Sequence, residues 1–166
     1  MSFEFFTQNS KLETRNSKPE TKLMHIDSLD FGEIKMTSHA KGTFEVKLTP
    51  EDDKSGVAIV GRMTIDKRFD GDIVGSSKGL MVMAGTQVQG SAGYVAIEKV
   101  SATIAGRSGT FYLQHSGIMN RGTGSLTVVV IPDSGTDDLA GISGSLKINI
   151  EEGKHFYDFE YLLGGS

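Results

Sequence analysis

The sequence predicts an all-β protein, built as a closed eight-stranded antiparallel barrel, with a β-sandwich as the alternative. Three observations predict this fold class. Hydrophobic and polar residues alternate with a period of two over most of the chain after residue 36. Glycine is abundant at 21 of 166 residues whereas proline occurs only three times, which suits tight turns and close strand crossings. No segment of ten residues shows the periodicity of a helix.

The first strand shows the alternation most clearly. Phe44, Val46 and Leu48 alternate with polar side chains until Pro50 ends the run. Asp70-Gly71 is a hairpin signal between the second and third strands. The strands after the first are predicted over residues 57–67, 72–84, 93–105, 109–119, 124–131, 144–151 and 155–163.

The connection between the sixth and seventh strands is the longest one. Residues 133–143 form this loop, and Asp137 to Ala140 suit one helical turn within it. Eight antiparallel strands on about 130 residues are enough to close a barrel whose interior is packed or holds one small ligand. The barrel domain is therefore assigned to residues 36–166. Residues 1–35 are polar and show no sustained period, so they are expected to form a flexible N-terminal extension.

Composition and charge exclude several classes of function. The net charge is −4 and the pI is near 5.5, so no nucleic-acid partner and no membrane partner are predicted. The absence of cysteine excludes disulfides and thiol catalysis, and the four histidines lack the spacing of metal ligands. We therefore predict no metal and no cofactor. The sequence shows no secretory signal and no run of 18 apolar residues, so a cytoplasmic location is expected.

Two hairpin registers follow from matching apolar faces across a turn. A turn at residues 106–109 places Ile104 opposite Phe111 and Ala102 opposite Leu113. A turn at residues 151–154 places Ile148 opposite Tyr157 and Leu146 opposite Phe159. Both registers pair apolar side chains with apolar side chains.

Several motifs carry a resemblance to a known family. They are Tyr94-x-Ala96-x-Glu98-x-Val100, Gly106-Arg107-Ser108-Gly109-Thr110-Phe111, Leu113-Gln114-His115-Ser116-Gly117 and the run from Ser134 to Gly144. Together they resemble a bacterial family of unknown function that is assigned to the allene-oxide-cyclase-like barrel superfamily. The resemblance covers about residues 36 to 163, and it implies the same barrel fold.

The stretch from Gly135 to Gly144 also resembles the G-T-G-x-F-x-x-A-x-G signature of plant allene oxide cyclases and dirigent proteins. Three positions depart from this signature, because Asp137 replaces a glycine, Leu139 a phenylalanine and Ile142 an alanine. This resemblance would imply that the barrel binds an unsaturated fatty-acid epoxide, as in allene oxide cyclases, or steers radical coupling, as in dirigent proteins. Neither activity is carried over to this chain, since similar folds host different functions.

Glu98 and His115 form the strongest candidate site. Both lie on otherwise apolar faces of neighbouring strands, and the register above makes them diagonal neighbours with Cα atoms roughly 7–8 Å apart. It also places Gly117 opposite Glu98, where the missing side chain leaves space. A carboxylate and an imidazole in an apolar barrel can orient each other and exchange a proton, which makes them catalytic candidates. The alternative is a structural pair that fixes the strand register.

Other residues complete the predicted ligand site. The Tyr94 hydroxyl adds a polar contact, and Arg107 is placed to grip an anionic group at the rim, or else to pair with a rim carboxylate. Phe111, Tyr157 and Phe159 are expected to form apolar walls, or else part of a packed core.

One motif is discounted. The run Gly75-Ser76-Ser77-Lys78-Gly79 fits the G-x-S-x-G pattern of a nucleophile elbow. Such an elbow requires a strand, a sharp turn and a helix, whereas this region has the pattern of an antiparallel strand.

The sequence therefore supports three functional hypotheses. The preferred one is a barrel that binds a small apolar or amphipathic molecule in its interior. The second is an isomerase or cyclase that uses Glu98 and His115 as acid and base. The third is a structural module with a solid core. A homo-oligomer is expected under all three.

Overall fold

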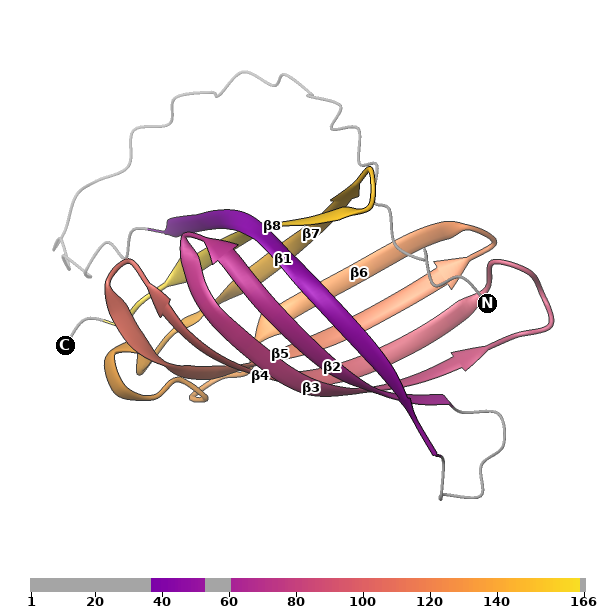
Figure 1. Ribbon diagram of the computed structural model, residues 1–166, viewed down its shortest axis with the longest axis horizontal. Coiled ribbons are helices and arrows are strands. Elements are labelled where there is room, and N and C mark those ends of the chain that lie inside the picture. The colour runs from indigo at the N-terminus through magenta and orange to yellow at the C-terminus, as the bar shows by residue number, and fades with distance from the viewer. Residues whose placement is uncertain (1–36, 53–60, 165–166) are drawn as a thin grey trace, which may run out of the picture.

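The computed structural model describes residues 37–52 and 61–164 and confirms the predicted closed barrel of eight antiparallel strands (Figure 1). Each strand pairs with the next one in the chain, and β8 pairs with β1. The N-terminal extension predicted for residues 1–35 and the first residues of the strand predicted at 57–67 lie outside the described residues. The strands are β1 (Ser38–Glu51), β2 (Gly61–Gly71), β3 (Ile73–Gly85), β4 (Ala92–Ile104), β5 (Arg107–Asn120), β6 (Thr123–Val130), β7 (Ser143–Glu151) and β8 (Lys154–Leu162).

Alternating burial explains why these segments form strands of a barrel. Along β5, Phe111, Leu113 and His115 are buried, while the residues between them are exposed. The same alternation turns one face of each strand inward, which is the pattern expected of a sheet closed on itself. The pairing of β6 with β7 is the shortest, with Val129 opposite Ser145.

The two predicted hairpin registers had different outcomes. The β7–β8 register is confirmed, with Ile148 opposite Tyr157 and Leu146 opposite Phe159. The β4–β5 register was wrong by four residues, because Ile104 pairs with Arg107. The turn is tighter than expected, since Ala105 and Gly106 both have positive φ, at 50° and 78°. Two such residues form a two-residue hairpin, and alanine gives little signal for that geometry. The shift is even, so every side chain keeps its predicted face.

The loop between β6 and β7 closes one end of the barrel. It contains the expected helical turn as a 3-10 helix, η1 (Asp137–Leu139). Leu139 and Ile142 are fully buried beneath the loop, and the Thr136 N–H donates to the Thr110 carbonyl oxygen at 2.9 Å. This end is therefore sealed by apolar side chains and by backbone pairing to β5.

The barrel interior is divided into two halves. The half next to the η1 loop is packed with aromatic and branched side chains, and we call it the packed half. The other half contains a smaller cluster made of Met63, Ile65, Met81 and Ala96, and we call it the hollow half. The buried members of the packed half are Ala40, Phe44, Phe69, Ile73, Val100, Ala102, Ile104, Phe111, Leu113, Val128, Val130, Leu139, Ile142, Leu146, Tyr157, Phe159 and Tyr161.

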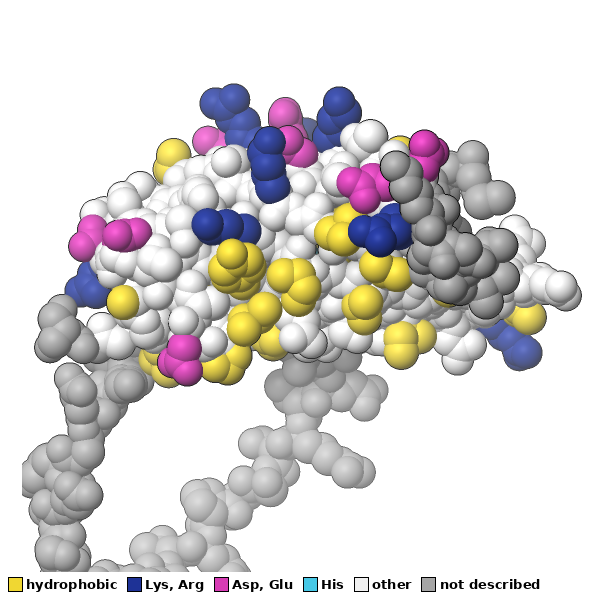
Figure 2. All heavy atoms as spheres, turned by 90° about the horizontal axis from the view of Figure 1, so that it is seen from below, with side chains coloured by type: hydrophobic (Ala, Val, Ile, Leu, Met, Phe, Trp, Pro, Cys, Tyr) yellow, Lys and Arg dark blue, Asp and Glu magenta, His cyan; other side chains and the backbone are white. Residues whose placement is uncertain are grey.

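The outer surface is uneven in character. Figure 2 shows hydrophobic side chains gathered along one side of the barrel, bordered by lysine and arginine side chains. The large exposed hydrophobic residues on β3, β4 and β5 are Val74, Val95, Ile97, Tyr112 and Ile118. In the described part of the chain, no helix has the length and hydrophobicity needed to span a membrane.

Candidate functional site

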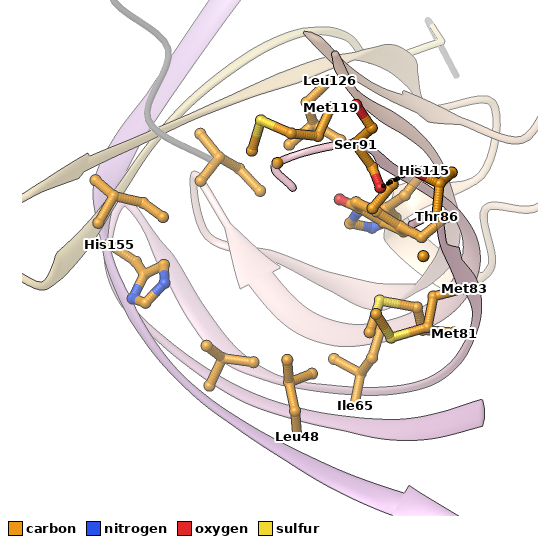
Figure 3. Close-up of a pocket in the computed structure, with 18 of the residues that line it drawn as sticks. Leu48, Ile65, Met81, Met83, Thr86, Ser91, His115, Met119, Leu126 and His155 are labelled. Carbon is orange, nitrogen blue, oxygen red and sulfur yellow. Dashed lines mark hydrogen bonds between the residues drawn. The ribbon is translucent and has the colours of Figure 1, made fainter. Parts of the chain in front are cut away.

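The hollow half encloses a cavity of about 530 Å³. It lies at the end of the barrel that carries the β3–β4 turn, opposite the η1 loop. Figure 3 shows the labelled side chains, among them Ile65, Met119 and His155, surrounding one common space. The described lining is formed by Phe44, Val46, Leu48, Ile65, Lys67, Met81, Met83, Gly85, Thr86, Val88, Gln89, Gly90, Ser91, Ala92, Gly93, Tyr94, His115, Met119, Leu126, Ile148, Ile150 and His155.

Most of this lining is apolar and adaptable. Three methionines, Met81, Met83 and Met119, contribute to the wall. Methionine has an unbranched, polarisable side chain that fits ligands of irregular shape. The cavity wall is therefore suited to an apolar surface without a single rigid outline.

A cluster of polar groups lies where the cavity meets the packed half. Its centre is the Glu98 carboxylate, which is 0% exposed. The Lys67 ammonium donates to Glu98 Oε2 at 2.7 Å, and the Ser77 hydroxyl donates to Glu98 Oε1. His115 Nε2 lies 3.1 Å from Glu98 Oε2. Lys67, Ser77 and His115 are themselves only 6%, 2% and 3% exposed.

Strand register brings these four residues together. They come from the consecutive strands β2, β3, β4 and β5, and Lys67 lies directly opposite Ser77. Gly79 lies opposite Glu98, and a Cβ atom there would approach the Glu98 Cα and Cβ atoms to 3.0 and 3.1 Å. A glycine at this position therefore lets the sheet close tightly against the buried carboxylate.

The contacts keep Glu98 ionised. Burial by itself would raise the pKa of its carboxyl group, but the contacts with His115 and Lys67 outweigh burial and lower the pKa to about 2. A buried carboxylate that accepts from an ammonium and a hydroxyl is a stable partner and a weak base. Glu98 is therefore suited to orienting its neighbours rather than to taking up protons.

His115 is held in its neutral form. Burial lowers the pKa of the imidazole, and the Lys67 charge lowers it further against the opposing effect of Glu98. Although Nε2 is close to the carboxylate, it makes no well-aligned hydrogen bond within the described residues. A bare Nε2 would face carboxylate lone pairs, so electrostatics favours the tautomer with the proton on Nε2. Nδ1 is then the acceptor nitrogen of the ring.

Tyr94 lines the cavity above this cluster. Burial, followed by the Glu98 charge, raises the pKa of its hydroxyl to about 12, so the group stays protonated near neutral pH. Its ring covers Gly117, where a Cβ atom would collide with it. The prediction that Gly117 lies opposite Glu98 was wrong, because Gly117 pairs with Tyr94 and Glu98 pairs with Leu113. The space left by the glycine is occupied by the tyrosine ring.

The structure separates the other predicted ligand contacts from the cavity. Phe111 and Phe159 are fully buried in the packed half, where their rings stack with centroids 5.8 Å apart. Arg107 is exposed at the β4–β5 turn, which lies at the opposite end of β4 from the lining residues of the β3–β4 turn. These three residues do not belong to the described lining.

Tyr157 is also outside the described lining, and its hydroxyl has a structural partner. The Tyr157 hydroxyl accepts from the Ile73 N–H at 2.8 Å and donates to the Asp70 carbonyl oxygen at 3.3 Å. These bonds join β8 to the β2–β3 hairpin. Tyr157 therefore belongs to the packed core, in agreement with the core-packing interpretation of these aromatic residues.

Lys67 and Ser77 were not among the site residues predicted from the sequence. A signal for Lys67 was present, because it occupies an inward position between Ile65 and Phe69 on β2. A charge on an alternating apolar face indicates a buried partner. Ser77 occupies the centre of the discounted G-x-S-x-G run, which does form an antiparallel strand. Among the described residues, no group of three or more histidine, aspartate or glutamate side chains is arranged to hold a metal ion.

Fold and site together define the class of this protein as an antiparallel β-barrel with an interior cavity above a buried ion pair. The chain belongs to a family of proteins of unknown function, DUF3224, which matches residues 40–161. That range extends from β1 to β8, so the family similarity covers the barrel.

A solved structure supports this assignment. The chain is similar to a protein of unknown function from the DUF3224 family of Shewanella oneidensis MR-1, with 46% sequence identity and a TM-score of 0.74. The similarity covers 79% of this chain and 100% of the other chain. A comparison with curated proteins found no match. The wider similarity to allene oxide cyclases stays a prediction.

Proposed function

We propose that this protein binds a small apolar or amphipathic molecule in the hollow half of the barrel. The observation that carries the proposal is the cavity of about 530 Å³, whose walls are mostly apolar and whose polar contacts include Lys67 and His115. Ligand cavities in proteins usually measure about 300–1,000 Å³ and combine apolar walls with a few placed polar groups. Burial of apolar ligand surface would supply the affinity, and the polar cluster would fix the orientation.

The interior location agrees with the superfamily predicted from the sequence, whose members use the barrel interior. The cavity disfavours the alternative of a solid core, because about 530 Å³ of the interior is not filled by side chains. The homo-oligomer and the cytoplasmic location remain predictions.

If the protein were an enzyme, the electrostatics of the cluster would limit which of its residues could act as a base. An isomerase or cyclase would need a group that exchanges protons near neutral pH. The pKa of Glu98 is about 2, so the carboxylate would orient His115 and the imidazole would act as the base. Binding requires no such step, and it is therefore the function that the geometry supports best.

The proposal is tested by native mass spectrometry of the full chain purified from its own host. Denaturing extraction of the same sample then identifies any small molecule that was bound. We expect a stoichiometric apolar ligand, and the same spectra give the oligomeric state.

Two matched variants locate the ligand. Ile148→Trp fills the cavity from β7, whereas Ile97→Trp adds the same ring on the outer surface, where Ile97 is 44% exposed. We expect the first variant to lose the ligand and the second to retain it. An empty wild-type protein, or a folded Ile148→Trp protein that retains the ligand, would contradict binding in the barrel interior.

A further inference from the structure

We propose that the cavity selects an uncharged molecule with a carbonyl or hydroxyl oxygen, and that this oxygen lies against the Lys67 ammonium. The inference rests on the proposed function and names the ligand class of the same site. It excludes carboxylates and amines as the preferred ligands.

The charge balance of the cavity favours an uncharged ligand. Among the described lining residues, Lys67 is the only aspartate, glutamate, lysine or arginine side chain. Its charge is already matched by Glu98, whose carboxylate oxygen lies 2.7 Å from the ammonium. The cavity therefore offers a neutral ion pair rather than a net charge.

The two imidazoles in the lining add no charge to this balance. Burial lowers the pKa of both His115 and His155, and the Lys67 charge lowers both further. Both rings are therefore neutral near neutral pH. The charged groups that act on His115 are Glu98 and Lys67, and these two form an ion pair with each other.

Bringing a further charge into the cavity would cost free energy. A ligand carboxylate would have to compete with Glu98, which already holds Lys67 and accepts from Ser77. Two carboxylates at one buried site repel each other. A ligand ammonium would meet Lys67 and would find no free carboxylate in the described lining. In either case an ion would be buried without a partner, which is strongly unfavourable.

Lys67 has hydrogen-bond donors to offer to an uncharged ligand. An ammonium has three N–H donors, and within the described residues Lys67 donates a single hydrogen bond, to Glu98. Its Nζ atom also lies 4.8 Å from the centroid of the Phe44 ring. Donors therefore remain for an oxygen acceptor in the cavity. A carbonyl or hydroxyl oxygen accepts such a bond without adding charge, and a charge-assisted hydrogen bond is stronger than a neutral one.

The experiment compares four ligands with the same number of carbon atoms and different end groups. Decanol, methyl octyl ketone, decanoate and decylammonium are titrated into the full chain near neutral pH and followed by calorimetry. We expect the alcohol and the ketone to bind at least about tenfold more tightly than either ion. Decanoate or decylammonium binding as tightly as the alcohol would overturn the inference while leaving the barrel a ligand-binding protein. Failure of all four to bind would instead overturn the proposed function.

A variant inverts the expected preference. Glu98→Gln keeps the shape of the side chain and leaves the Lys67 charge unmatched, so decanoate should gain at least about tenfold relative to decanol. Glu160→Gln makes the same change at an exposed position on β8 and should leave the preference unaltered. Circular dichroism verifies that each variant is folded. An unchanged preference in folded Glu98→Gln protein would overturn the inference, and if that variant does not fold, the wild-type series decides.

Discussion

The packed half and the hollow half of this barrel are built from the same eight strands, yet they have opposite properties. In the packed half the inward residues are large, and Phe111 and Phe159 stack without exposure to solvent. In the hollow half, the inward side chains leave a cavity of about 530 Å³. A barrel of eight strands has an interior just wide enough for side chains to fill. The way in which the inward side chains fill this space therefore decides which half contributes stability and which half has room for a ligand.

Several of the motifs that carry the family resemblance lie at the end of the barrel closed by the η1 loop, and there they have a structural role. Gly109 packs directly against the Thr136 carbonyl oxygen, and Gly135 packs against the Leu139 carbonyl oxygen. Leu139 and Ile142 seal that end from inside. The stretch from residue 106 to residue 144 thus contributes largely to closing the packed half, whereas His115 within it reaches the cavity.

The largest expected difference between the halves is the cost of removing a core side chain. Phe159→Ala should lower the free energy of unfolding by about 3–5 kcal/mol, because it empties a filled site between Phe111 and Tyr161. Met81→Ala should cost less than about 2 kcal/mol, since it enlarges a cavity that already exists. Urea unfolding of both variants measures the difference. Equal losses would show that the hollow half is as tightly packed as the other.

Acid unfolding tests the ion pair at the boundary between the halves. The pKa of Glu98 is lowered from 4.5 to about 2, so the unfolded chain binds the proton first as the pH falls. The carboxylate therefore contributes stability above pH 4.5, and this contribution of about 3 kcal/mol is lost as the pH falls through about 2.

Glu98→Gln should remove that part of the pH dependence, whereas Glu160→Gln at the exposed position on β8 should keep it. The measurement is the free energy of unfolding in urea at a series of acidic pH values. A Glu98→Gln protein that loses as much stability in acid as the wild type would show that the pair does not hold the carboxylate in its ionised form.

A smaller difference in stability is expected between two matched glycine-to-alanine variants, one in each half of the barrel. Gly109→Ala places a Cβ atom against the Thr136 carbonyl oxygen, which is backbone and cannot move aside, so we expect a loss of about 1–3 kcal/mol. Gly117→Ala meets the Tyr94 ring, which borders the cavity and can shift into it. The second variant should therefore lose less stability in thermal unfolding and should reduce the cavity instead. The reverse order would contradict the placement of free space beside Tyr94.

The smallest expected effect is in local opening of the barrel. The pairing of β6 with β7 has Val129 opposite Ser145, whereas the ladder of β4 with β5 runs from Ala92 opposite Met119 to Ile104 opposite Arg107. Backbone amides with few ladder partners open more easily. Hydrogen exchange followed by mass spectrometry should therefore show faster exchange in β7 than in β4. Uniform protection of the two strands would indicate that this seam is closed more firmly than its pairing suggests.

The meeting of Glu98 and His115 was predictable even though the register was not. Both residues were placed on the inward face because alternation fixes the face of each strand. The tighter turn at Ala105 and Gly106 moved the register by four residues, and an even shift preserves the faces. The two side chains consequently remain diagonal neighbours, now with Leu113 opposite Glu98 and Ala96 opposite His115. The prediction survived because the inward faces were right and because a shift of four residues moves His115 from one diagonal position beside Glu98 to the other.

The sequence by itself determined the strands and their inward faces, because these follow from local periodicity and turn residues, and it favoured a closed barrel over a β-sandwich. Only the tertiary structure decided that Lys67 and Ser77 join Glu98 and that Phe111, Tyr157 and Phe159 lie away from the cavity. The physical reason is that a cavity is the space left after all eight inward faces have packed. Its position depends on side chains from distant strands at the same level of the barrel, and no local pattern along one strand specifies that level.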